Sequence, residues 1–454
     1  MSAKGLISHI LDYRKLISAF LATLLFLAFL YYVHIPKNLL YSVLLVLLCF
    51  ALYLGSKQKN NLLVLGVLGG VSLVVVLFQL WQAWSTFFVI NEWDFLALYT
   101  YGKAGADGLA FYDPASFTHF METIPVNMQL SQDFYDSVIK VGCDYPPTSM
   151  LLFAPLGSLE VHTALVVWRL FIILALLADI YLVYKIFDTH ENRWFRLLIV
   201  VILVFVLPST NMTLNLCQTN FFVLFFILLA YRDKDNWKAG MFLALAVVFK
   251  PVAAVVSLYF FVNRKWKPIT SFILTGLALC LLSILFFGWS NFITFFTSPP
   301  TSRIPLTNYY AITFNQSLYA ILYRLSLHDG MALLSQNLSM IVLFSSAVLT
   351  ATACLGSVRL SRINSNAAFL IFLPLALLIY PLFWIHYAVI LLPLLFEIIS
   401  YKNKTALSYF LVIFLLVINS IFTACLLLLA LLVFFSFRKQ SVFGPIDIKF
   451  LHFR

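Results

Sequence analysis

The chain is a series of long apolar runs separated by short polar segments. Near the N-terminus three such runs extend from about Leu16 to Val33, Leu39 to Leu54 and Leu62 to Trp84. Their apolar residues are continuous rather than alternating, which favours α-helices over the strands of a membrane barrel. A spanning helix needs about 20 predominantly apolar residues, because its backbone must satisfy its own hydrogen bonds in lipid. The pattern therefore predicts an all-α polytopic membrane protein, and the first run, which no small-residue cleavage site follows, is expected to be retained.

Two stretches after the third run have the pattern of amphipathic helices. In LSQDFYDSVIKVG, residues 130–142, apolar Phe134 and Val138 share one face while Asp133 and Asp136 lie on the other. DFLALYTYGKA reads the same way, with Asp94 at a natural N-cap position. Both are expected to lie in the membrane interface.

Between residues 146 and 288 the apolar pattern is interrupted. Pro146 to Leu156 is too short to span a membrane, and Lys250-Pro251 divides another apolar run into two arms. Short, broken helices at membrane depth are tolerated where they line a cavity or are buried in protein, so these breaks indicate a site. Together the runs predict about 12–14 transmembrane helices.

Composition and charge fix the class and the orientation. Of the 454 residues 63% are hydrophobic and 10% are charged, a balance that excludes a soluble globular domain. The net charge of +11 lies mainly in short loops between apolar runs, so it indicates topology rather than binding to nucleic acid. Placing the basic loops inside puts both termini in the cytoplasm. The six cysteines look mostly like small core residues, and a disulfide between Cys143 and Cys217 is a weak alternative.

These assignments divide the chain into five parts. They are an N-terminal three-helix segment (1–90), an extracytoplasmic catalytic loop with interfacial helices (91–145), a core bundle with broken helices (146–288), a second extracytoplasmic loop (289–330), and C-terminal transmembrane helices with a cytoplasmic tail (331–454).

Polar side chains gather toward the outer face in this topology. They include carboxylates, carboxamides and cations: Glu92, Asp94, Asp107, Asp113, Asp144, Gln218, Asn220, Lys250, Asn315, Arg324 and His386. Such a set suits transfer of a group from an anionic lipid carrier to a hydroxyl, because a carboxylate can remove the acceptor proton while a cation neutralises the departing phosphate. Neither a metal-ligand spacing nor a glycine-rich phosphate loop is present, so no metal and no cofactor are expected.

Six motifs occur in the order seen in glycosyltransferase family 87, which the chain resembles from Asp94 to about Pro393. They are NEWDFLALYTYGKAGADGLAFYDP, DYPPTSMLLFAPLGSL, LNLCQTNFFVLFFILLA, AGMFLALAVVFKP, FNQSLYAILYR and YPLFWIHYAVILLPLL. The resemblance implies a C-type glycosyltransferase fold similar to that of the mycobacterial polyprenol-dependent mannosyl- and arabinosyltransferases.

The resemblance also implies roles for individual residues. Asp94 is expected to be the catalytic general base, and donor phosphate binding falls to Lys250, with Arg169 and His386 as further candidates. Substrate-binding positions are expected at Asp113, Asp144, Tyr145, Gln218, Asn220, Asn315, Arg324 and Tyr387. Cys217 replaces the glycine of the family's Gly-Gln-x-Asn turn, which restricts the backbone there. Two helices also precede the one that leads into the catalytic loop, and the simplest C-type plan lacks them.

Each residue has a structural alternative. Asp94 could cap a helix, Asp113 could begin a turn, and His386 could belong to an interfacial aromatic belt. Lys250 within an apolar run costs about 2.5 kcal/mol or more unless it snorkels or pairs, which favours a functional role. A secondary transporter or lipid flippase would also have about 12 spans with broken helices. A scaffold for envelope assembly is a third alternative, and it leaves the motif order unexplained.

The sequence therefore predicts a multi-pass glycosyltransferase of the plasma (inner) membrane with its active site on the extracytoplasmic face. It is expected to move a sugar, with mannose as the expected one, from a polyprenyl-phosphate donor to an extracytoplasmic acceptor hydroxyl with inversion. The expected partners are this lipid donor, a glycolipid, polysaccharide or protein acceptor, and the lipid bilayer.

Overall fold

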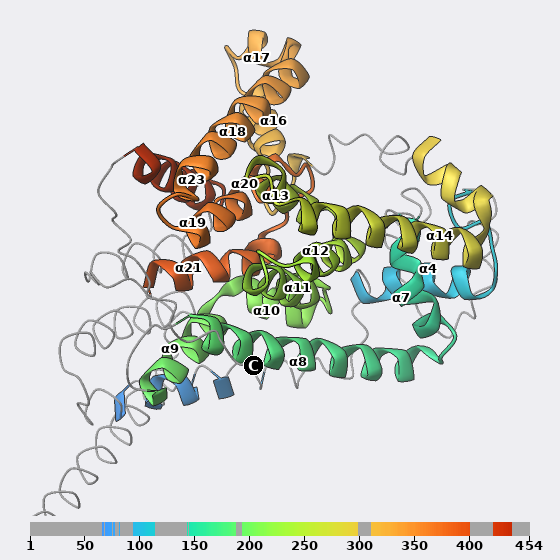
Figure 1. The fold of residues 1–454 in the computed structure, drawn as a ribbon. Helices are drawn as coiled ribbons and strands as arrows, with labels where there is room; N and C mark the ends of the chain where they lie inside the picture. Colours follow the sequence, from blue (N-terminus) through green and yellow to red (C-terminus); the bar gives the residue numbers. More distant parts are fainter. Residues whose placement is uncertain are drawn as a thin grey trace, which may run out of the picture.

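A computed structural model gives the architecture of the chain (Figure 1). It describes eleven positions between residues 66 and 81, all of them helical, and then residues 94–113, 143, 145–187, 193–297, 310–399 and 421–437. Within these residues the chain is helical, and its extended pairing is limited to an isolated bridge between Asn315 and Trp384.

The described helices occur along the chain in the following order. They are α4 (Asp94–Ala106), α7 (Pro147–Gly157), α8 (Val161–Ile186), α9 (Arg193–Val206), α10 (Pro208–Asn215), α11 (Asn220–Arg232), α12 (Trp237–Phe249), η1 (Pro251–Val256), α13 (Ser257–Val262), α14 (Trp266–Thr297), α16 (Leu318–Ser326), α17 (Ala332–Gln336), α18 (Leu338–Leu360), α19 (Ser365–Leu370), α20 (Phe372–Ile379), η3 (Ile385–Leu391), α21 (Leu392–Ile399) and α23 (Ile421–Phe437).

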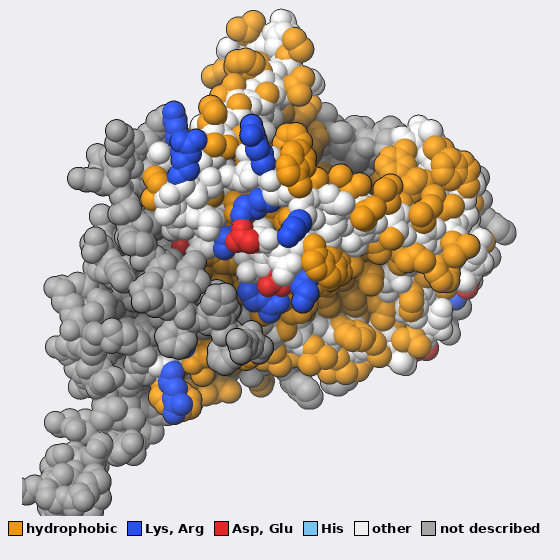
Figure 2. Space-filling model, viewed as in Figure 1, with side chains coloured by type: hydrophobic (Ala, Val, Ile, Leu, Met, Phe, Trp, Pro, Cys, Tyr) orange, Lys and Arg blue, Asp and Glu red, His pale blue; other side chains and the backbone are white. Residues whose placement is uncertain are grey.

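Several helices are suited to lipid. In the described part of the chain α8, α14 and α18 are each long and apolar enough to cross a membrane, and α9 with α10 would form a fourth span bent by 65°. Hydrophobic side chains cover the visible surface of α14 and α18 (Figure 2). An all-α polytopic membrane protein is thereby confirmed, whereas the count of about 12–14 spans stays a prediction.

The core bundle lies between two long helices. In Figure 1, α8 and α14 flank α11 and α12, which pack on each other, and α4 packs on α7 near one end of this arrangement. Helices α18 to α23 lie toward the other end, with α16 to α18 projecting from the body.

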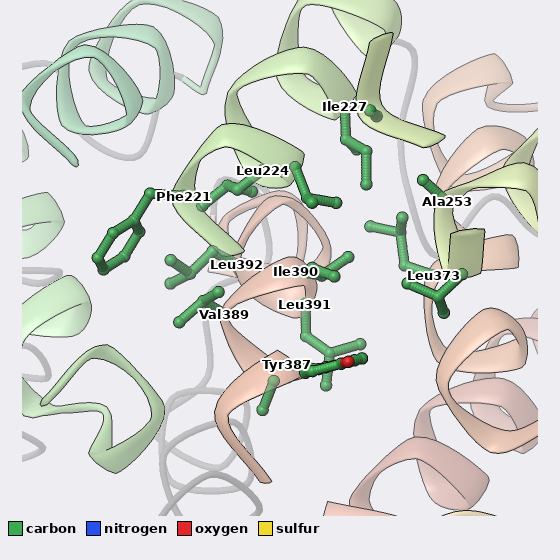
Figure 3. Close-up of a cluster of buried hydrophobic side chains, with 14 of the residues drawn as sticks. Phe221, Leu224, Ile227, Ala253, Leu373, Tyr387, Val389, Ile390, Leu391 and Leu392 are labelled. Atoms are coloured by element: carbon green, nitrogen blue, oxygen red, sulfur yellow. The ribbon is translucent and has the colours of Figure 1, made fainter. Parts of the chain in front are cut away.

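Three segments far apart in sequence meet in the buried core of the bundle. Figure 3 shows Phe221 and Leu224 of α11 beside Val389 of η3 and Leu392 of α21, while Ala253 of η1 lies toward α20. These apolar contacts fix the start of α11 against η3. The polar residues at the outer ends of both elements are therefore held close together.

The predicted helix breaks are confirmed. Helix α7 has 11 residues. Helix α12 ends at Phe249, and Lys250 takes an extended conformation with φ −150° and ψ 121° before η1 begins at Pro251. Proline lacks an N–H and disfavours the helical region for the residue before it, which explains why the helix ends there.

Residues 94–106 form helix α4, as predicted. The helix does not have the expected division into one buried and one exposed face. Most of its residues between Phe95 and Gly105 are buried, on all sides of the helix. Gly102 and Gly157 explain this, because a Cβ on Gly102 would lie 2.1 Å from the Phe153 carbonyl oxygen. Small residues let α4 and α7 approach closely, so α4 is inserted into protein. The second predicted amphipathic helix, residues 130–142, lies outside the described residues.

Candidate active site

The break at Lys250 places an ammonium group inside the bundle. Its residue is 3% exposed. Nζ donates a hydrogen bond to Gln218 Oε1 at 2.8 Å and lies 3.6 Å from the centre of the Tyr387 ring. A carbonyl oxygen and an aromatic face are both attractive to a cation, so they stabilise a charge that would be costly in an apolar interior.

Gln218 reaches Lys250 from the turn between α10 and α11. The residue before it, Cys217, has a φ of +55°, a left-handed conformation that glycine adopts without strain and other residues seldom take. This is the position at which the sequence departs from the glycine of the family pattern. Cys217 takes the backbone conformation that a glycine would take at this position. The predicted restriction of the backbone therefore strains the turn and does not change its shape.

The Cys217 turn is fixed by two consecutive residues of α8. Trp168 Nε1 donates to the Cys217 carbonyl oxygen at 2.9 Å, and Arg169 Nε donates to Cys217 Sγ at 3.2 Å. All three residues are buried, and both Cys143 and Cys217 are free thiols, so the weak disulfide alternative is wrong. Sequence reasoning missed Trp168, because a tryptophan in an apolar helix is typical of packing.

Asp94, in the first turn of α4, completes a cluster with Gln218 and Lys250. Burial raises the pKa of its carboxyl group to about 6, and the Lys250 ammonium and the Gln218 side chain oppose part of that rise by favouring the carboxylate. Helix α4 is not among the candidate spans. A carboxyl group with a pKa near the working pH can both accept and release a proton, which is what general base catalysis requires.

His386 and Asn220 lie beside this cluster. Asn220 Nδ2 donates to the His386 carbonyl oxygen at 3.0 Å and to Thr213 Oγ1 at 3.0 Å, which ties the start of α11 to η3 and α10. His386 Nε2 and Asn220 Oδ1 are buried, and neither makes a hydrogen bond in the structure of the described residues. Because buried polar atoms normally have a partner, these two atoms are available to a bound molecule or to water.

Asn315 and Arg324 support the site from the following segment. Asn315 is buried, its Nδ2 donates to the Pro381 carbonyl oxygen at 3.0 Å, and its backbone pairs with Trp384. Arg324 Nη1 donates to the carbonyl oxygens of Tyr310 and Ile312, each at 2.9 Å. Both side chains therefore hold main chain in place, and Asn315 does so directly before His386 and Tyr387.

The remaining predicted residues lie on the α4–α7 side. Asp113 is half-buried in the bend after Tyr112, whose hydroxyl donates to the Tyr145 carbonyl oxygen. The Tyr145 ring packs edge-on against Phe153 at 5.6 Å. Asp144 lies outside the described residues, so its place relative to the site stays a prediction.

The chemistry available to the cluster is proton transfer beside a fixed cation. Asp94 can take a proton from a hydroxyl, while Lys250 can neutralise a phosphate oxygen. No group of three or more histidine, cysteine or acidic side chains that could hold a metal ion occurs in the described part of the chain. The expectation of no metal stays a prediction.

Comparison with known proteins supports the family resemblance over residues 144–381, a range that does not include Asp94. The sequence model of glycosyltransferase family 87 matches residues 144–381. A curated relative, the polyprenol-phosphate-mannose-dependent alpha-(1-2)-phosphatidylinositol pentamannoside mannosyltransferase of Mycolicibacterium smegmatis (strain ATCC 700084 / mc(2)155), is 26% identical over 191 residues. This alignment covers 41% of the present chain and 42% of the relative, so the chain spans less than half the length of that protein. No solved structure matches the chain.

Proposed function

The chain belongs to glycosyltransferase family 87, and from this premise we propose that it transfers a sugar from a polyprenyl-phosphate donor to the hydroxyl of an acceptor. The sugar proposed is mannose, which the name of the mycolicibacterial relative supports. The observation that carries the proposal is the convergence of Asp94, Gln218 and Lys250 from three separate segments of the chain.

Asp94 acts as the general base in this proposal. The acceptor hydroxyl gives its proton to the Asp94 carboxylate as its oxygen forms a bond to the anomeric carbon. The bond from that carbon to the phosphate oxygen breaks, and the polyprenyl phosphate leaves with the electron pair. Attack from the face opposite the phosphate inverts the anomeric configuration.

Lys250 stabilises the charge that grows on the departing phosphate. Its ammonium is held by Gln218 Oε1 and the Tyr387 ring, so it needs little rearrangement when the phosphate arrives. His386 adjoins Lys250, and its Nε2 and Asn220 Oδ1 are suited to hydrogen bonds with the donor. The Asn220 oxygen only accepts, so it suits a sugar hydroxyl, whereas the His386 nitrogen can donate to a phosphate oxygen or accept from a hydroxyl according to its tautomer.

The donor determines where the reaction takes place. A polyprenyl chain remains in the bilayer, so the reacting groups must lie at the membrane surface, and the proposed side is the extracytoplasmic face of the plasma membrane. The acceptor proposed is a glycolipid, in line with the pentamannoside substrate in the name of the relative. A polysaccharide or a protein would present the same attacking hydroxyl.

The test is transfer of labelled mannose from polyprenyl-phosphate mannose to a phosphatidylinositol mannoside by the purified protein in liposomes. We expect product and free polyprenyl phosphate in equal amounts. Asp94→Asn should lower kcat by about 100-fold or more, because a positioned base contributes about 10²–10⁴-fold.

Asp107→Asn is the matched control. Asp107 lies just beyond the other end of α4, and its exposed carboxylate pairs with Lys103 at 3.4 Å, so its loss should leave kcat within about twofold. Normal turnover by a folded Asp94→Asn protein would overturn the role of Asp94. Movement of unmodified donor across the liposome membrane without product would instead identify the flippase alternative.

A further inference from the structure

Two neighbouring residues of α8 bind the same residue of the α10–α11 turn. Trp168 Nε1 donates to the Cys217 carbonyl oxygen at 2.9 Å, and Arg169 Nε donates to the Cys217 thiol at 3.2 Å. Trp168 is itself fixed by a stacked contact with Phe222 at 5.2 Å. The backbone and the side chain of Cys217 are therefore both held from one side.

The conformation that these contacts hold is one the residue would otherwise leave. Cys217 has a φ of +55°, which is disfavoured for a residue with a Cβ. Conformations of this kind persist where the surroundings over-determine them. Since Gln218 follows immediately, the Cys217 backbone sets the direction in which the Gln218 side chain leaves the turn.

Gln218 is the residue through which this geometry reaches the reacting groups. It accepts from Lys250 Nζ at 2.8 Å and also interacts with the Asp94 carboxyl group. A neutral amide that contacts both the carboxylate and the ammonium helps to keep the two groups at set positions. Displacement of the turn would therefore disturb the base and the cation together.

We propose that Trp168 and Arg169 form a clamp whose role is to hold the left-handed Cys217 turn and so to position Gln218 between Asp94 and Lys250. The proposal rests on the glycosyl transfer proposed above for its catalytic consequences. It makes Arg169 a positioning residue, in contrast to the donor-phosphate ligand that the sequence predicted. The 5% exposure of Arg169 and the use of its Nε by the thiol both favour this role.

A double-mutant cycle separates the two roles. Arg169→Met should lower kcat by about 10- to 100-fold with little change in the KM for polyprenyl-phosphate mannose, because misplacement of reacting groups by about 1 Å costs that much. Cys217→Ala keeps the Cβ and removes the thiol, so it should have a smaller effect in the same direction. The double variant should be no slower than Arg169→Met, because both substitutions remove the same contact, the hydrogen bond from Arg169 to the Cys217 thiol.

If Arg169 instead bound the donor phosphate, the kinetic results would differ. Arg169→Met would then raise the KM for the donor, and its effect would multiply with that of Cys217→Ala. Trp168→Phe, which keeps a ring for the stack on Phe222 but removes the indole donor, should lower kcat if the clamp exists. Lys185→Met removes an exposed cation from the last turn of α8 and should leave kcat within about twofold.

A second readout does not require activity. Modification of Cys217 by a maleimide, followed by mass spectrometry of the peptide that contains it, should be slow in the parent protein and at least about tenfold faster in Arg169→Met and Trp168→Phe, because a released turn opens locally. Faster modification of the variants together with no mannose transfer by the parent protein would retain the clamp and reject the proposed function. Unchanged modification and additive kinetic effects would overturn the clamp.

Discussion

At the scale of the residue, Cys217 stores backbone strain beside the reacting groups. A left-handed conformation costs a residue with a Cβ about 1–2 kcal/mol. A hydrogen bond contributes about 0.5–1.5 kcal/mol net, so the contacts from Trp168 and Arg169 together can offset the strain. The strained turn is therefore a stable feature of the fold.

Asp94 should give the reaction an acid limit near pH 6. Its pKa of about 6 means that the base is mostly ionised at neutral pH and becomes protonated as the pH falls through 6. Since the protonated acid cannot accept the hydroxyl proton, kcat/KM should fall about tenfold for each pH unit below that value. Initial rates of mannose transfer between pH 4.5 and 8 measure this.

Protonation of Asp94 should lower the activity at acid pH, but it should raise the stability of the folded protein there. The pKa of Asp94 is higher in the folded protein than its ordinary value of 3.8, so the folded state binds the proton more tightly and loses that advantage as the pH rises through about 6. Asp94→Asn, which mimics the protonated form, should therefore raise the Tm at pH 8 and have little effect below pH 3.8. A lower Tm for Asp94→Asn at pH 8 would contradict the raised pKa.

The sequence identified the reacting side chains because their chemistry is out of place in an apolar chain. Lys250 was identified by the cost of an ammonium group in lipid, and Asp94 by the order of the motifs around it. The roles of Trp168 and Arg169 could not be predicted, since they depend on the left-handed turn at Cys217, and a sequence specifies such a conformation only where glycine stands.

At the scale of the element, the crossing of α4 on α7 sets the position of Asp94. A Cβ on Gly102 would lie 2.1 Å from the Phe153 carbonyl oxygen, and backbone cannot yield as a flexible side chain does. Gly102→Ala should therefore lower the free energy of unfolding by about 1–3 kcal/mol and reduce kcat, because the helix that carries the base must move. Thermal unfolding and transfer rates of the purified protein test both effects.

Gly105 provides the control within the same helix. A Cβ there would lie 3.5 Å from the Phe287 ring and 3.7 Å from Ala154, which are ordinary contacts. Gly105→Ala should leave activity unchanged and stability the same or slightly higher, since alanine favours helix over glycine. Equal effects of the two substitutions would show that the close crossing is not what positions α4.

Helix breaks were predictable from the sequence, whereas helix packing was not. Pro251 excludes a hydrogen bond whatever its surroundings are, so the end of α12 before it follows from the residue alone. The burial of α4 depends on two glycines, Gly102 and Gly157, that meet across a helix pair. Nothing in either glycine alone indicates its partner, and the pattern of polar positions in α4 predicted an exposed face that the close crossing covers.

At the scale of the whole molecule, the surface has separate apolar and basic regions. Exposed hydrophobic side chains line α14 and α18, as expected for helices in contact with lipid. Lysine and arginine side chains gather near the middle of the face in Figure 2. Exposed cations lie at or near the ends of α11 and α13 and the starts of α12 and α14: Arg232, Lys238, Arg264 and Lys267. Exposed Trp237 and Trp266 accompany them, which is typical of the level of the lipid headgroups.

Hydropathy alone does not distinguish the helices that can span the membrane from the shorter apolar helices packed around the site. Helices α8 and α18 stand out because each is a single continuous helix of predominantly apolar residues. Elements such as α11, α12 and η3 have the same composition and are shorter, so their positions depend on the packing around the site rather than on the thickness of the bilayer. The count of about 12–14 spans predicted from the sequence includes the long helices and the short ones without distinction.

The orientation of the molecule can be tested with cysteines introduced on its two predicted sides. Lys238 lies in the first turn of α12 among the basic loops, and Asp329 lies in the turn after α16, within the predicted outer loop. Because short basic loops remain in the cytoplasm, Lys238→Cys should react with a membrane-impermeant maleimide after the cells are opened and not before. Asp329→Cys should react in intact cells, with the parent protein giving the background from its own cysteines. The reverse pattern would place the Asp94 cluster on the cytoplasmic side, where the attacking hydroxyl would have to come from a cytosolic acceptor.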